Sequence, residues 1–303
     1  MNLPAYYGIK RLYPRLGKLG AYLSLVRPFT CIVAFVAGIS LNYLFASLSR
    51  IEATFGLSLA VGLTLALLHG GSQSWQQSVS CEIEIDKINK PYRAIPSGII
   101  KPEEGKIMSV ALFSLAVAIA FTISTTFLLF VIITLLFAIF YVSPPIRVKR
   151  IFVVNNLWQG ISRGLLPMLC VSSIYACEKL ALAYGVPLTI WVAGAQATKD
   201  FTDVEGDRKF GIMTFPVKLG ITNAIKAICI FVIASFVILV TFSVFGVLPK
   251  SFLLISVLSI PSALMVYFLK KGTVIEKMEN NAGWCMFYLT LGLFYIVPVL
   301  TCL

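Results

Sequence analysis

Apolar runs recur along the whole chain, and short polar segments separate them. An α-helix needs about twenty residues to cross a bilayer, and only elements that satisfy their own backbone hydrogen bonds are stable there. The 303 residues are 58% hydrophobic and 13% charged, whereas soluble domains are about 45–50% apolar and about 25% charged. We therefore expect an all-α, polytopic membrane protein with one domain over residues 1–303.

Nine segments are predicted to cross the membrane: residues 28–47, 55–77, 107–122, 126–142, 152–175, 180–198, 222–245, 251–269 and 282–302. The Ser/Thr stretch between the third and fourth predicts a tight turn, because one continuous helix there would be far longer than a bilayer is thick. The fifth segment contains Gly160, Arg163, Gly164 and Pro167, which predicts a kink.

The basic residues predict how these segments are oriented. Counted over nine segments, they concentrate in alternate connections, beginning with the N-terminal one. The opposite connections hold three of the 25 basic residues: Arg50, Lys179 and Lys250. Because cytoplasmic loops are enriched in Lys and Arg, we expect a multi-pass protein of the cell membrane with its N-terminus inside and its C-terminus outside. Topology and anionic lipids then account for the net charge of +12, and no nucleic-acid partner is expected.

Acidic residues are few and clustered. Seven of the 13 lie in two short segments, namely Glu82, Glu84 and Asp86, and Asp200, Asp203, Glu205 and Asp207. Each segment directly follows an apolar run, the second and the sixth, on the predicted cytoplasmic side. The seven cysteines form no CxxC pair and the single histidine, His69, lies near the end of an apolar run. Metal chemistry based on His or Cys is therefore not expected.

The spacing within both segments suits one helical face. Ser78, Glu82 and Asp86 recur every four residues, and the three aspartates of the second segment recur at intervals of three and four. Each set would line one face if its helix continues past the membrane. Like charges at this spacing repel one another, so a cation is expected between them. Oxygen ligands alone suit a hard cation such as Mg²⁺, which can also bridge to a phosphate.

Basic residues accompany both acidic segments: Lys87, Lys90, Arg93, Lys199, Arg208 and Lys209. A third basic cluster on the same predicted side consists of Arg147, Lys149 and Arg150. A metal–diphosphate site needs both signs of charge, because the metal takes some phosphate oxygens and Lys or Arg takes others. Four polar residues end the second run, namely Gln73, Ser74, Gln76 and Gln77. They are costly in lipid and are expected to face an interior cavity.

The two acidic segments resemble the two signature motifs of the UbiA superfamily of intramembrane prenyltransferases. The first is EIEIDKINKPYRAIPSG at 82–98, and the second is KDFTDVEGDRKFGIMTFPV at 199–217. They occur in the family's order, each after an even-numbered helix, and the resemblance covers essentially the whole chain. The family's first motif usually has Asn followed by Asp four and eight positions later. This chain has Ser78, Glu82 and Asp86 at those positions.

The resemblance implies a ring of nine transmembrane helices around a central cavity, with a cytoplasmic cap of short helices in the acidic segments. It also implies transfer of an isoprenyl group from an isoprenyl diphosphate donor to a lipophilic or aromatic acceptor, with Mg²⁺ assisting ionisation of the allylic diphosphate. An aromatic quinone precursor is the first expectation for the acceptor. A geranylgeranylglyceryl phosphate, as in ether-lipid synthesis, is the alternative.

Site residues are expected in both motifs and in the third basic cluster. The expected metal ligands are Glu82, Asp86, Asp200, Asp203 and Asp207. The residues expected to bind the diphosphate are Ser78, Lys90, Arg93, Arg147 and Lys149. Tyr141 ends the fourth segment and is expected to contact the substrate and to steady the allylic cation with its ring. Together with Asp203 and Asp207 it is expected to be catalytic.

A membrane transporter is the alternative from another class, because intramembrane charges also mark ion and substrate pathways. The clustering of acids at one membrane face argues against it, since transporter sites lie near the midplane. An enzyme that transfers a phospho-alcohol from a CDP-linked lipid would also use an Asp-rich metal site. Its usual Asp-Gly-x-x-Ala-Arg sequence is absent from the chain.

Overall fold

The computed structural model describes residues 13–271 and 281–301, which form helices and loops without a β-strand. Eight helical segments in this part are long and apolar enough to cross a membrane. They are α2 (Pro28–Leu48), α3 (Phe55–Ser78), α5 (Pro102–Ile123), α6 (Thr125–Val142), α9 (Glu178–Ala195) with η4 (Gln196–Thr202), α11 (Phe215–Val244), η5 (Lys250–Leu258) with α12 (Ser259–Lys270), and α13 (Ala282–Leu300). The predicted polytopic all-α fold is confirmed.

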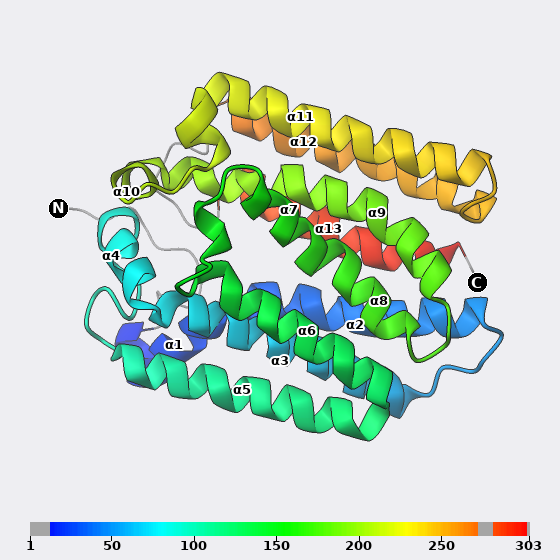
Figure 1. Cartoon of the computed structure of the whole chain (residues 1–303), viewed down its shortest axis with the longest axis horizontal. Coiled ribbons are helices and arrows are strands. Elements are labelled where there is room, and N and C mark those ends of the chain that lie inside the picture. The colour runs from blue at the N-terminus through cyan, green and yellow to red at the C-terminus, as the bar shows by residue number, and fades with distance from the viewer. Residues whose placement is uncertain (1–12, 272–280, 302–303) are drawn as a thin grey trace.

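The fifth predicted segment is an interrupted crossing. It consists of α7 (Val154–Gly160), a π-helical turn η3 (Ile161–Leu165) and α8 (Leu166–Ser172), which follow one another along the bundle (Figure 1). The expected number of nine therefore corresponds, in the described residues, to eight long helices and this three-part segment. The helical pattern is therefore irregular where the sequence predicts a kink.

The helices close into a ring in which sequence neighbours pack together. Contacts run in order from α2 through α3, α5, α6, the α7–α8 segment, α9, α11 and α12 to α13, which returns to α2. Small residues permit close packing of α2 on α3, because a Cβ at Gly38 would lie 2.7 Å from the Cα of Gly62. Close approach at small residues is the usual way in which helices associate within a bilayer.

Local sequence explains where these helices begin. Ser124 is extended between α5 and α6, and its side-chain oxygen accepts a hydrogen bond from the Phe127 backbone N–H at 3.1 Å. Thr54 caps α3 in the same way. Both residues satisfy N–H groups that have no partner in the first helical turn. The predicted tight turn between the third and fourth segments is thus confirmed.

Short helices gather at one end of the bundle. Figure 1 shows α1 (Tyr13–Val26), α4 (Ser80–Asn89) and α10 (Val204–Lys209) at this end, whereas α13 finishes at the opposite end. We call the end that carries α4 and α10 the cap. The cap of short helices agrees with expectation, but α1 was not predicted. The expectation that the second helix continues past the membrane is wrong, because α3 ends at Ser78 and Val79 is extended before α4 begins.

Candidate active site

Asn89, the last residue of α4, joins the two acidic segments. Its Nδ2 donates to the Asp203 carbonyl oxygen at 3.0 Å, and its Oδ1 accepts from the Gly206 backbone N–H at 2.8 Å. Gly206 permits this approach, because a Cβ there would lie 2.6 Å from the Asn89 Nδ2. The buried Asn89 side chain therefore links segments that are more than a hundred residues apart in sequence.

Ion pairs connect the carboxylates of the cap to cations of the same and of other segments. Glu82 accepts from Arg147 Nη2 at 3.0 Å and also from Lys149. Two further pairs, Asp86 with Arg93 and Asp203 with Lys90, are likewise shielded from solvent. Seven of the predicted residues line one polar chamber: Glu82, Asp86, Lys90, Arg93, Tyr141, Lys149 and Asp203. The acids and bases that the sequence places in three separate loops thus converge.

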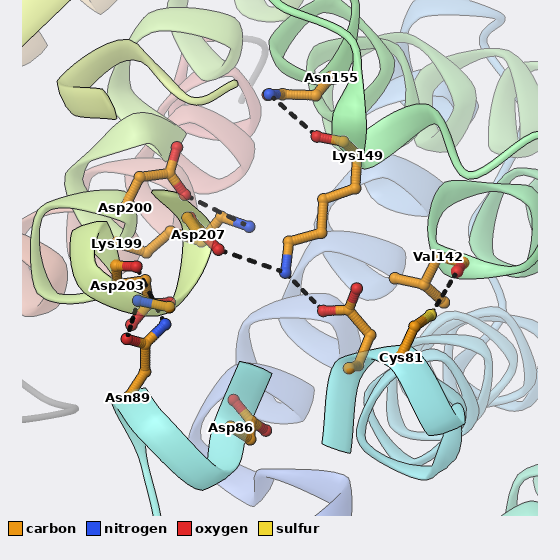
Figure 2. A network of polar contacts seen from close by, with 12 residues as sticks. Cys81, Asp86, Asn89, Val142, Lys149, Asn155, Lys199, Asp200, Asp203 and Asp207 are labelled. Atoms are coloured by element: carbon orange, nitrogen blue, oxygen red, sulfur yellow. Dashed lines mark hydrogen bonds and ion pairs between the residues drawn. The ribbon is translucent and has the colours of Figure 1, made fainter. Parts of the chain in front are cut away.

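Lys149 lies between the two acidic segments. Figure 2 shows its side chain extended beside Asp200, Asp203 and Asp207 of the second segment, with its amine directed toward Asp207. Its Nζ is bonded to Glu82 and lies 4.0 Å from Asp207 Oδ1. Burial alone would lower the pKa of Lys149, but the charges of Glu82 and Asp207 raise it well above its ordinary value. Burial would likewise raise the pKa of Glu82, yet Lys149 and Arg147 hold it below its usual range.

Asp207 is the least satisfied carboxylate of the cap. Its Oδ1 is buried and accepts no hydrogen bond from the described residues. Burial, together with the charges of Asp203 and Asp200, raises the pKa of Asp207 to about 8. An orphaned buried carboxylate is costly unless a cation or proton neutralises it. The site therefore has capacity for a further cation.

The described residues contain no group of three Asp, Glu, His or Cys side chains that is arranged to hold a metal as it stands. Their chemistry nevertheless fits Mg²⁺, because the acids of the cap offer carboxylate oxygens and one of these, Asp207 Oδ1, accepts no hydrogen bond from the described residues. Lys149 also holds a positive charge between two of the carboxylates. Carboxylates that already hold one positive charge between them are suited to hold a divalent metal ion in the same place.

Tyr141 lies where the polar chamber meets an apolar cavity, and its side chain lines both. Lys199 Nζ donates to the Tyr141 hydroxyl at 3.3 Å and lies 5.5 Å from the ring centroid. Phe137 and Trp158 stack at 4.0 Å between centroids in the wall of the cavity. A charged group bound in the chamber would thus be next to a space that is suited to a hydrocarbon chain.

Comparisons with known proteins agree with this arrangement. The model of the UbiA prenyltransferase family matches residues 28–291. The chain belongs to the UbiA prenyltransferase family. Prenyl transfer is accordingly its activity, and the transporter alternative has no support.

Two relatives of the chain are named for different reactions. Digeranylgeranylglyceryl phosphate synthase of Methanocaldococcus jannaschii is 29% identical over 212 residues, which cover 67% of this chain and 69% of that protein. Homogentisate phytyltransferase of Synechocystis sp. is 24% identical, and the match covers 80% of each chain. The fold is that of a UbiA homolog from Archaeoglobus fulgidus bound to DMAPP and Mg²⁺, with a TM-score of 0.71 at 18% identity over 93% of this chain and 98% of that one.

Ser78 occupies the family's usual Asn position but points away from the chamber. Its hydroxyl donates to the Ser74 carbonyl oxygen at 2.7 Å, and a Cβ at Gly105 of α5 would lie 2.1 Å from the Ser78 oxygen. The side chain is fully buried at this helix contact. The break at Val79 explains this, because Ser78 no longer shares a helix with Glu82 and Asp86.

Several residues in this UbiA-type site were not predicted. Arg27 and Thr202 line the polar chamber, and Asn89 links the motifs. Lys199 was noted only as a flanking charge, yet it also lines the chamber and contacts Tyr141. Three expected residues do not line the chamber but contact residues that do. Arg147 pairs with Glu82, and Asp207 Oδ1 lies 4.0 Å from Lys149 Nζ. Asp200 Oδ1 lies 3.9 Å from Lys199 Nζ.

Proposed function

We propose that this prenyltransferase binds an isoprenyl diphosphate with its diphosphate in the polar chamber and its chain in the adjoining cavity. The observation that carries this proposal is the junction at Tyr141, where a chamber of interleaved acids and bases meets an apolar space. An allylic diphosphate has this same division between a highly charged end and a hydrocarbon end. Helices that exclude water around the cavity would protect a carbocation-like fragment from hydrolysis.

Mg²⁺ is the proposed cofactor, and its proposed ligands are Glu82, Asp86, Asp203 and Asp207, with Asp200 as a further carboxylate. When bound with the donor, Mg²⁺ neutralises charge that develops on the leaving diphosphate. Lys90, Arg93 and Lys149 neutralise three of these carboxylates in the described structure. A diphosphate would draw these cations to its own oxygens and so free the carboxylates for the metal.

Tyr141 is proposed to steady the allylic cation with the face of its ring, since a cation near an aromatic face is stabilised by roughly 0.5–2 kcal/mol. Its position between chamber and cavity supports this role, because the ring would lie beside the breaking bond of a donor bound across both spaces. Lys199, which is hydrogen-bonded to the Tyr141 hydroxyl, fixes the orientation of the ring. Arg147 is proposed to hold Glu82 in place and to contribute charge toward the diphosphate.

Two acceptor classes are proposed. A prenylated glyceryl phosphate follows from the relative in Methanocaldococcus jannaschii, and an aromatic ring of the homogentisate type follows from the relative in Synechocystis. The stacked rings of Phe137 and Trp158 in the cavity wall support the aromatic acceptor, because an aromatic ring could pack against them. In either case the nucleophilic atom of the acceptor would have to reach the Tyr141 end of the cavity.

Incubation of purified protein with geranylgeranyl diphosphate and each acceptor, with and without Mg²⁺, tests this function. We expect a prenylated product and released diphosphate only when the metal is present. Chelation by EDTA should abolish turnover, and added Mg²⁺ should restore it. Product formation that continues at full rate after chelation would contradict the proposed cofactor. Absence of product from both acceptors, with donor binding intact, would contradict both acceptor classes.

The cap is proposed to face the cytoplasm. The end that carries α4 and α10 also carries most of the loops rich in Lys and Arg, whereas Arg50, Lys179 and Lys250 lie at the other end. Positive charge favours the cytoplasmic side. Labelling of a single cysteine introduced at exposed Lys179 by a membrane-impermeant reagent in intact cells should succeed. Labelling of one at exposed Lys87 instead would reverse the orientation.

A further inference from the structure

Arg163 is a charged residue within the interrupted crossing. It lies in the π-helical turn η3, between two glycines that press this segment against α9. A Cβ at Gly160 would lie 2.5 Å from the Thr189 carbonyl oxygen, and one at Gly164 would lie 2.6 Å from the Thr189 backbone nitrogen. Arg163 lies between these glycines in sequence, and its side chain lines the apolar cavity.

No carboxylate pairs with Arg163 in the part of the chain that the structure describes. Its Nη1 donates to the Tyr288 hydroxyl at 2.6 Å, its Cζ lies 5.8 Å from the Tyr288 ring centroid, and its carbonyl oxygen accepts from the Tyr295 hydroxyl. Two tyrosines of α13 thus fix the backbone and one edge of the guanidinium. A charge at this depth is costly when it lacks a counter-ion, and such residues generally mark a binding site.

The cavity around Arg163 supplies no negative charge of its own. None of the residues that line it is Asp or Glu. It adjoins the polar chamber, because Gln76 and Tyr141 line both spaces. Arg163 itself does not line the chamber, which Lys90, Arg93, Lys149 and Lys199 line and where the diphosphate is proposed to bind. The molecule therefore presents a second, separate position for an anion, on the far side of Tyr141.

We propose that Arg163 binds an anionic group of the acceptor, a carboxylate or a phosphate, and so orients the acceptor in the cavity. This proposal rests on the proposed function, because it assigns the acceptor to the space that adjoins the donor's diphosphate. Tyr288 takes one of the five N–H groups of the guanidinium, which leaves a fork that can bind two oxygens of an acid side by side. The acid would lie against Arg163 and the nucleophilic atom would point toward Tyr141.

Binding of matched acid and neutral ligands to the full-length protein in detergent tests the proposal. The first pair is homogentisate and its carboxamide, and the second is geranylgeranylglyceryl phosphate and geranylgeranylglycerol. We expect wild type to bind the acid of at least one pair about 10- to 100-fold more tightly, as a charged hydrogen-bonded pair allows. The pair that shows this preference identifies carboxylate or phosphate as the source of the anion.

Arg163→Leu should reduce the preference for the acid to about onefold, and Arg163→Lys should retain part of it, because Lys keeps the charge without the fork. Arg163→Gln keeps an N–H donor for Tyr288 and removes the charge, so it replaces the Leu variant if that one does not fold. Lys179→Leu is the control, since it removes an exposed charge at the start of α9, ten residues before the Thr189 contact with the Arg163 segment. It should leave the preference unchanged.

Three results would overturn the proposal. Wild type could bind acid and neutral ligands equally in both pairs, or Arg163→Gln could retain the full preference. Arg163→Gln could also weaken Mg²⁺-dependent binding of geranylgeranyl diphosphate while the acid preference persists, which would assign this arginine to the donor. Failure of wild type to bind the donor would contradict the proposed function separately, because acceptor binding is measured without donor or metal.

Discussion

Replacing Asn89 by alanine removes a side chain that hydrogen-bonds from the first acidic segment to the backbone of the second. Two hydrogen bonds are lost, to the Asp203 carbonyl and from the Gly206 N–H, and each contributes about 1 kcal/mol net. The donor must contact both acidic segments at once. Without Asn89, part of the free energy of donor binding is used to bring the two segments together, so the measured affinity falls. A cost of about 2 kcal/mol corresponds to an affinity about 30-fold lower.

Gly206→Ala should produce a similar defect from the other side of the same contact, because its Cβ would lie 2.6 Å from the Asn89 Nδ2. The double variant should be no worse than either single one, since alanine at position 89 leaves room for a Cβ at position 206. Such non-additivity is the sign of a direct contact. Asn223→Ala is the control, because among the described residues Asn223 bonds only within α11, to the Leu219 carbonyl oxygen.

The assay is Mg²⁺-dependent binding of geranylgeranyl diphosphate to detergent-purified protein, with thermal unfolding of the same samples. Asn89→Ala should bind the donor about 30-fold more weakly while it still unfolds in a single transition. An affinity equal to that of wild type in both single variants would refute the idea that Asn89 holds the two motifs together. Strictly additive losses in the double variant would refute the direct contact.

Glu82→Gln should lower turnover by at least about 100-fold, as loss of one charge-stabilising group at an active site does, whereas Glu84→Gln on the exposed face of the same helix should not. Equal losses in a prenyl-transfer assay would contradict the assignment. Gly38→Ala should destabilise the protein by about 1–3 kcal/mol through overpacking, while Gly56→Ala, which meets no atom within 4 Å, should be neutral in thermal unfolding. Because the pKa of Asp207 is raised to about 8, its proton must leave before metal binds. The apparent Mg²⁺ affinity should therefore fall as pH drops from about 8.5 to about 6.5, and a pH-independent Mg²⁺ titration would contradict this.

Helix content and crossing order could be predicted because the physical rule is local. A run of apolar residues in a bilayer must satisfy its own backbone hydrogen bonds, and the positions of the runs follow directly from composition. The Ser/Thr turn at Ser124 was predictable for the same reason, since a single helix across it would not fit. The clustering of acids near one face was visible from their positions after the second and sixth runs.

Which acid pairs with which base was not predictable, because this depends on how distant helices are placed. Spacing put Ser78 on the same face as Glu82, but the helix breaks at Val79 and turns Ser78 toward α5. One β-branched residue is too common within helices to signal such a break. Asn89 carried no local signal either, since its two partners are more than a hundred residues away. The individual roles assigned to the site residues stay predictions.

The most direct test of the central claim is binding of geranylgeranyl diphosphate to wild type, Asp203→Asn and Glu205→Gln, each with and without Mg²⁺. Asp203 is half-buried in the cap against Lys90, whereas Glu205 is an exposed acid two residues further on. The account predicts metal-dependent binding in wild type and Glu205→Gln and its loss in a folded Asp203→Asn protein. Full metal-dependent binding by Asp203→Asn would contradict it.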